Sequence, residues 1–194
     1  MTAAPPQVDV RFLSKEEFLA HLTEALEVYV LAMGYPKATI KQRAPLWREH
    51  TYRPGWRAIG AISSKGRLIG LAYGYIGAGG QWWHDEIQRG LRAADPTKQS
   101  WLTDYFELSE LHVLPQAQGG GIGERLLRGL LSDVTTATVL LSTPEIDPAR
   151  PGRAWRLYRR LGFVDVLRAY YFVGDSRPFA VLGRQLPLPD RRAT

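Results

Sequence analysis

The sequence predicts a single α/β domain over residues 1–194, with a mixed sheet flanked by helices and a core over about 8–186. Three observations support this fold class. Segments with the two-residue period of strands are interleaved with segments of helical period. Their order is one strand, two helices, three strands, helix, strand, helix and two strands, as in a mixed sheet with flanking helices. The 194 residues are enough to bury one core without disulfides.

The first strand is predicted over 8–13 (VDVRFL), where apolar and polar residues alternate. Ser14 and Glu17 have the spacing of a capping box, so a helix should begin there, and Gly34 and Pro36 should end it.

A second helix is predicted over 37–50, with an interruption at Pro45 because proline removes a helical hydrogen bond. Two apolar runs then flank the turn-forming residues 64–66, which indicates a β-hairpin.

Residues 79–104 form a long insertion, with a short helix predicted over 82–92. The insertion is rich in tryptophan, which argues against disorder. Trp82 and Trp83 fit either a lid over an acceptor pocket or, with a slight preference, a satellite core or a dimer contact that would make a homodimer. His84, in the triplet HDE, lacks metal-ligand spacing, and a solvated turn is the favoured interpretation.

The C-terminal half alternates clear strands and helices. Strands are predicted from Tyr105 and over 138–142, with an amphipathic helix from Ile122 between them. A further helix ends at Gly162 and Phe163, in the pattern of a glycine C-cap with a hydrophobic contact. Two more strands are predicted over 164–172 and 179–186, and residues 187–194 should fray.

Composition excludes several kinds of function. The chain has no cysteine, so disulfides, thiolate metal sites and a cysteine nucleophile are excluded, and its four scattered histidines predict no metal site. No apolar run approaches a membrane span, and the first ten residues lack a secretory signal, so we expect no membrane partner and a cytoplasmic location. The net charge of +6 suits anionic partners, but no nucleic-acid-reading motif is present.

Residues 118–123 (QGGGIG) join a strand that ends in Val-x-Pro to a helix. Helix N-termini offer free N–H groups and partial positive charge, and glycines let a ligand approach the backbone, so this loop is predicted to cradle phosphate rather than form a loose turn. It is not a Walker loop, because no Gly-Lys-Ser/Thr follows, and it fails the dinucleotide pattern G-x-G-x-x-G in both registers.

The loop resembles the acyl-coenzyme A loop of the GNAT superfamily, the Gcn5-related N-acetyltransferases. Gln118, Gly121 and Gly123 match that family's pattern Gln/Arg-x-x-Gly-x-Gly/Ala.

A second family pattern, Ala-x-x-x-Tyr-x-x-x-Gly-Phe, is matched downstream. Ala154, Tyr158, Gly162 and Phe163 occupy its positions. The resemblance covers about residues 105–173, and the first half agrees in element order. At one position where the family often has asparagine, this chain has Pro151, which puts one coenzyme A contact in doubt.

The resemblance implies a GNAT fold and an acetyl-CoA dependent N-acetyltransferase without a metal. The acetyl group would pass by direct attack to a primary amine of a small molecule or peptide. Backbone N–H groups would hold the pyrophosphate and the thioester carbonyl, and the implied cofactor-binding residues are Val113, Gln118, Gly119, Gly120, Gly121, Ile122, Gly123 and Glu124. The alternative is a non-catalytic acyl-CoA sensor or partner subunit of the same fold.

Two residues are candidates for proton transfer. Tyr158 resembles the family tyrosine that protonates the departing thiolate, and a core tyrosine is its alternative. Strand alternation puts Glu107 on the face of Val113 and puts Glu110 and His112 on the other face, so Glu107 is the candidate base. The alternative role for Glu107 is that of a carboxylate in a salt bridge. In that case Glu110 or a water chain could act as the base. His112 is predicted to pack beside the next strand.

For two further sets of residues the sequence leaves more than one role open. Arg125 and Arg128 follow the loop and either contact cofactor phosphates or form a solvated helix face. Tyr29, Met33 and Tyr35 could line the acceptor side.

Overall fold

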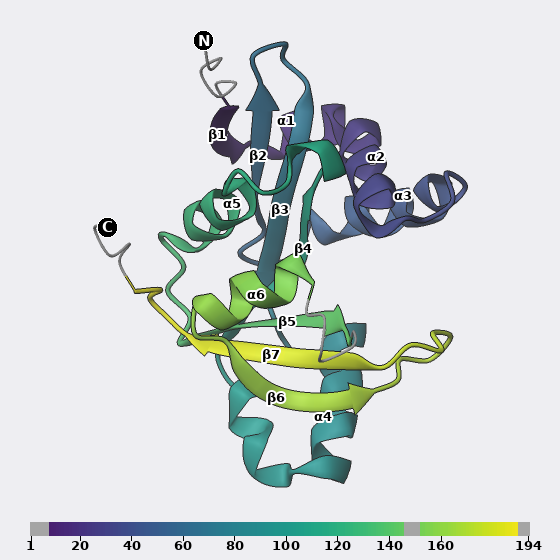
Figure 1. The fold of residues 1–194 in the computed structure, drawn as a ribbon. Coiled ribbons are helices and arrows are strands. Elements are labelled where there is room, and N and C mark those ends of the chain that lie inside the picture. Colours follow the sequence, from purple (N-terminus) through teal and green to yellow (C-terminus); the bar gives the residue numbers. More distant parts are fainter. Residues whose placement is uncertain (1–7, 146–151, 190–194) are drawn as a thin grey trace. The chain divides into compact units, whose positions relative to one another are not determined.

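The computed structural model describes residues 8–145 and 152–189 (Figure 1). Seven strands form one mixed sheet in the order β1-β2-β3-β4-β5-β7-β6, which confirms the predicted fold class. Strands β4 and β5 pair in parallel, whereas the β1–β2, β2–β3, β5–β7 and β6–β7 pairs are antiparallel. The described residues divide into two compact units, one comprising 8–75 and 109–133 and the other 76–108, 134–145 and 152–189.

The first unit packs helices on both faces of its strands. Its elements are β1 (Val8–Leu13), α1 (Lys15–Ala20), α2 (Leu22–Met33), α3 (Thr39–His50), β2 (Arg57–Ser63), β3 (Leu68–Ile76), the end of β4 (Tyr105–Val113), the short η2 (Pro115–Ala117) and α5 (Ile122–Leu131). Tyr73 of β3 contacts Phe18 of α1 and Trp47 of α3, and the three side chains are almost fully buried. On the other face, α5 approaches β2 so closely that a Cβ on Gly129 would lie 2.5 Å from Ile59.

The helical part of this unit corrects two predictions. The capping box of Ser14 and Glu17 is present, but the helix is divided at His21 into α1 and α2 before Gly34 ends it in a left-handed conformation. Helix α3 continues through Pro45 instead of being interrupted. The lost backbone hydrogen bond costs less than this helix gains by burying Trp47 completely.

The second unit contains the insertion and the C-terminal strands. Its elements are α4 (Trp82–Ala94), η1 (Pro96–Leu102), the start of β4, β5 (Thr138–Pro144), α6 (Arg153–Arg160), β6 (Val164–Tyr170) and β7 (Phe179–Gln185). Helix α4 buries Trp83, Ile87 and Leu91 in a core with Tyr105 and Leu140.

The insertion is therefore an ordered part of the unit. Trp83 is a core residue whose indole N–H donates to the Ser142 hydroxyl at 3.1 Å, whereas Trp82 is 57% exposed and lies over Phe172. The prediction of a solvated turn at His84 was wrong, because His84 and Glu86 are buried on α4. None of the helices in the described ranges has the length and apolar character needed to cross a membrane.

Candidate active site

The glycine loop and the strand before it belong to the first unit. Val113 is buried at the end of β4, and the Leu114 N–H donates to the Ile69 carbonyl at 2.9 Å. The Gln118 side-chain amide donates to the Val113 carbonyl at 2.9 Å. Gln118 thus fastens the loop to the strand that the sequence predicted to precede it.

The loop presents an open backbone at the start of α5. Gly119 and Gly121 have φ of +93° and +75°, which L-residues with a side chain rarely adopt. A Cβ at Gly119, Gly120 or Gly121 would meet no heavy atom within 4 Å among the described residues. Gly121 is the N-cap and makes no side-chain capping bond, so α5 begins without a side-chain cap, at the helix end that favours anions.

The charged residues of α5 are engaged in contacts of their own. Arg128 pairs with Glu124 at 2.9 Å, one turn earlier on the helix. Arg125 donates to the Val8 carbonyl at 3.0 Å, which ties α5 to β1. The loop therefore offers backbone N–H groups rather than these side chains as its ready anion donors.

The sequence did not predict a polar cluster on the α2 side of β4. His112 Nε2 lies 2.5 Å from Glu110 Oε2, and the imidazole ring meets Tyr29 edge to face at 5.0 Å. His112 therefore contacts α2 through Tyr29, a contact that the sequence did not indicate. Burial, followed by the Glu110 carboxylate, raises the pKa of Tyr29 to about 12, and Arg43 opposes that shift.

Tyr158 lies in the second unit and is buried on α6, with its ring 5.4 Å from that of Phe163. The helix ends as predicted. Gly162 has φ +80°, its N–H donates to Arg159, and the Phe163 N–H donates to the Tyr158 carbonyl at 3.0 Å. These two bonds form a Schellman motif, which fixes the last turn and with it the position of Tyr158.

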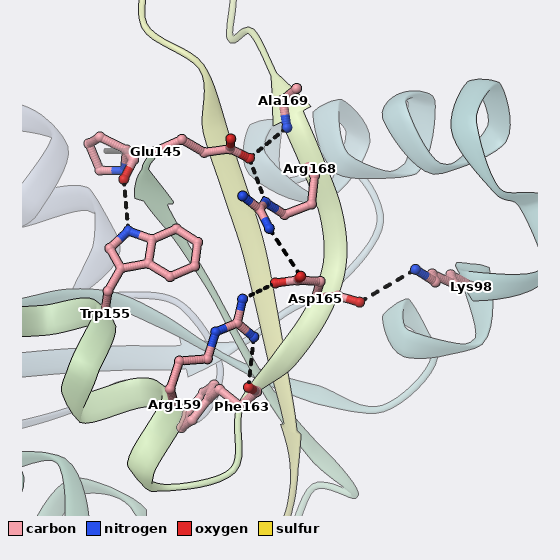
Figure 2. A network of polar contacts seen from close by, with 9 residues as sticks. Lys98, Glu145, Trp155, Arg159, Phe163, Asp165, Arg168 and Ala169 are labelled. Atoms are coloured by element: carbon pink, nitrogen blue, oxygen red, sulfur yellow. Dashed lines mark hydrogen bonds and ion pairs between the residues drawn. The ribbon is translucent and has the colours of Figure 1, made fainter. Parts of the chain in front are cut away.

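A salt-bridge network anchors α6 to β6 and the end of β5 (Figure 2). Asp165 binds both Arg159 and Arg168, and Arg168 also donates to Glu145 at 2.7 Å. The hydrogen bond from Arg168 lowers the pKa of Glu145. Both guanidinium groups lie over the ring of Trp155, whose N–H donates to the Pro144 carbonyl at 3.0 Å.

Glu107 is also in the second unit, in the part of β4 that pairs with β5. It is 4% exposed and lies opposite Leu140 in the register. Strand alternation puts it on the face of Tyr105, which α4 covers through Trp83 and His84. A carboxylate this buried is costly unless it has a specific role or partner.

The predicted site residues thus fall into two sets. The predicted cofactor-binding residues lie in the first unit, and the two proton-transfer candidates lie in the second. Pro151 lies outside the described residues. Within the described ranges, no group of three His, Asp or Glu residues could hold a metal ion.

Comparison with known proteins gives one close relative and many similar folds. A GCN5-like protein acetyltransferase of Mycobacterium tuberculosis, Rv2170, is 47% identical over 191 residues, which cover 86% of this chain and 92% of the relative. No protein-family model matches the chain.

Solved structures share the fold at low identity. A GNAT-family protein from Desulfovibrio desulfuricans has a TM-score of 0.61 at 16% identity, covering 92% of this chain and 99% of its own. The ribosomal-protein-S18-alanine N-acetyltransferase of Escherichia coli has a TM-score of 0.59 at 16% identity, covering 97% of this chain and 99% of its own.

Proposed function

The chain belongs to the GNAT family of acetyltransferases, and on that premise we propose that it transfers the acetyl group of acetyl-CoA to a primary amine of a protein or peptide. Acetyl transfer is the family activity, whereas the acceptor is our proposal. It is supported by the name of the relative, a protein acetyltransferase. The net charge of +6 favours an amine in acidic surroundings over a polycationic small molecule.

The observation that carries the proposal is the open backbone of residues 119–121 at an uncapped helix start. We assign the pyrophosphate of coenzyme A to the N–H groups of Gly119 to Glu124, because the Gln118 N–H already donates to the Pro115 carbonyl at 3.3 Å. The helix dipole adds to their attraction for an anion. The N–H of Val113 is the candidate donor to the thioester carbonyl, where negative charge develops during the reaction.

The chemistry requires a deprotonated amine and a protonated leaving group. Glu107 is the proposed base that takes a proton from the amine. Tyr158 is the proposed acid that gives a proton to the coenzyme A thiolate. No covalent enzyme intermediate is needed, which agrees with the absence of cysteine from the chain.

Calorimetry with coenzyme A tests the loop assignment. Gly121→Asp should abolish binding, because it puts a carboxylate beside the pyrophosphate. The matched control is Gly66→Asp in the β2–β3 turn, since Gly66 has a φ of +73° and open space for a Cβ, as Gly121 does. Both variants carry the same backbone strain, so equal affinity in both would refute the assignment.

A panel of lysine-containing and N-terminal peptides tests the acceptor, with the freed thiol of coenzyme A as the readout. We expect turnover of lysine peptides with acidic neighbours. Binding of acetyl-CoA without turnover of any peptide or small amine would favour a non-catalytic acyl-CoA sensor instead.

A further inference from the structure

His84 is a buried histidine that has no role in the reaction proposed above. It lies in the first turn of α4 and is 6% exposed. Its Nδ1 is 3.1 Å from the Tyr105 hydroxyl oxygen, and the two rings stack with centroids 5.9 Å apart. This contact joins α4 to the strand that carries Glu107.

The backbone makes room for the Tyr105 hydroxyl. A Cβ at Gly77 would lie 1.9 Å from Tyr105 Cζ and 2.3 Å from its hydroxyl oxygen. The Gly77 N–H also donates to the Tyr105 carbonyl at 3.0 Å. Any other residue at position 77 would displace the phenol, so the position of this hydroxyl depends on a glycine.

The second imidazole nitrogen lies near an exposed turn. His84 Nε2 is 4.0 Å from the place where a Cβ of Gly79 would be, and among the described residues other than Gly79 and its two chain neighbours no further heavy atom lies within 4 Å of that point. Gly79 and its neighbours Ala78 and Gly80 are exposed. The exposed turn that contains Gly79 therefore lies beside this nitrogen.

Tyr105 is the member of the pair that belongs to β4, the strand of the proposed base. Tyr105 and Glu107 are two residues apart on one strand and share a face. Acetyl transfer converts an ammonium group and a thioester into an amide, a thiol and one released proton. Because Glu107 is 4% exposed, it needs a route by which that proton reaches solvent before the next turnover.

We propose that Tyr105 and His84 carry this proton from Glu107 to the solvent beside Gly79. The inference rests on the proposed function, and both residues act through Glu107 rather than on the substrate.

Each proton transfer in this route is balanced. The Glu107 proton passes to the Tyr105 oxygen, directly or through one water, while the Tyr105 proton passes to His84 Nδ1. The imidazolium then loses its Nε2 proton to water. The ring regains its starting tautomer by exchange with water once its hydrogen bond to Tyr105 opens.

The surroundings of His84 suit a relay that does not retain the proton. Burial lowers the pKa of His84, and the neighbouring Asp85 carboxylate offsets this only in part. The imidazolium therefore forms transiently and releases its proton. Asp85 itself accepts the Gly80 N–H at 3.0 Å, which holds the exposed turn beside the ring.

Kinetics on a lysine peptide test the relay. His84→Gln keeps a hydrogen-bond acceptor but cannot pass a proton on, and Tyr105→Phe removes only the hydroxyl. Each should lower kcat about tenfold and raise the solvent deuterium isotope effect, because proton release becomes rate-limiting. Imidazole added to His84→Ala should restore most of the rate.

Tyr170→Phe is the matched control. It also removes a hydroxyl that is bonded to α4, through Glu86 at 2.8 Å, and it should leave kcat and the isotope effect unchanged. If Tyr170→Phe and Tyr105→Phe lowered kcat equally, the contact between His84 and Tyr105 would only hold α4 against β4. That result would overturn the proposal. Wild-type kcat and isotope effect in both relay variants would do the same.

Nitrogen NMR of the His84 ring keeps this test separate from that of the proposed function. We expect the Nε2-protonated tautomer, with an Nε2 proton that exchanges rapidly with water. A fixed Nδ1-protonated ring protected from exchange would overturn the relay even in an active enzyme. Inactivity of the wild type on every amine, with the expected tautomer and exchange, would instead count against the proposed function.

Discussion

Replacing Tyr158 by phenylalanine should separate a catalytic role from a packing role. The ring is buried against Phe163, and the Schellman motif at Gly162 fixes the end of its helix, so the variant keeps the same ring in the same place. Loss of one buried hydroxyl contact costs about 1 kcal/mol. For a chain of this size that lowers Tm by about 2–4 °C.

Such a loss cannot lower the folded fraction enough to affect the rate, since domains of this kind are stable by about 5–15 kcal/mol. We therefore attribute any large fall in kcat to the missing acid. Removal of a general acid costs up to 10²–10⁴-fold, and a fall of about one to three orders of magnitude is expected. The dissociation constant of coenzyme A should change little, because the hydroxyl serves the leaving thiolate.

The assay combines kcat on a lysine peptide with calorimetry of coenzyme A. Phe163→Leu is the control, since it perturbs the packing of the same ring and keeps the Tyr158 hydroxyl. If Tyr158→Phe retained the wild-type kcat, or if Phe163→Leu lost as much activity, the acid role would be wrong.

Two more predictions concern groups that titrate. Glu107→Gln should lower kcat and alter the acidic limb of its pH profile, whereas Glu110→Gln should leave that limb in place; the reverse would move the base to Glu110. Burial lowers the pKa of His50 from 6.5 to about 3, so the unfolded chain binds more protons below pH 6.5 and the free energy of unfolding falls there. At about pH 4.5 this loss is about 3 kcal/mol, and urea denaturation should show that His50→Gln, which can still bond Tyr73, removes it.

Local signals in the sequence predicted local structure well. The spacing of Ser14 and Glu17 gave the capping box that the structure contains, and Gly162 followed by Phe163 gave the helix end that positions Tyr158. Each of these features involves residues a few positions apart, whose hydrogen bonds do not depend on the rest of the fold.

Features that depend on tertiary contacts could not be predicted. Pro45 remains within a helix that buries Trp47 completely, and tertiary packing of this kind overrides a local preference. His84 is buried because Tyr105, 21 residues later, covers it. The bond from Arg168 to Glu145 likewise joins residues 23 positions apart, which no spacing in the sequence indicates.

The central claim is that the glycine loop binds the pyrophosphate of coenzyme A through its backbone. Amide NMR during titration with coenzyme A, and separately with inorganic pyrophosphate, tests this most directly. We predict that the largest shifts with both ligands occur at the amides of residues 119–124, and that Gly121→Asp abolishes them while Gly66→Asp does not. Saturable coenzyme A binding that leaves these amides unshifted would contradict the account.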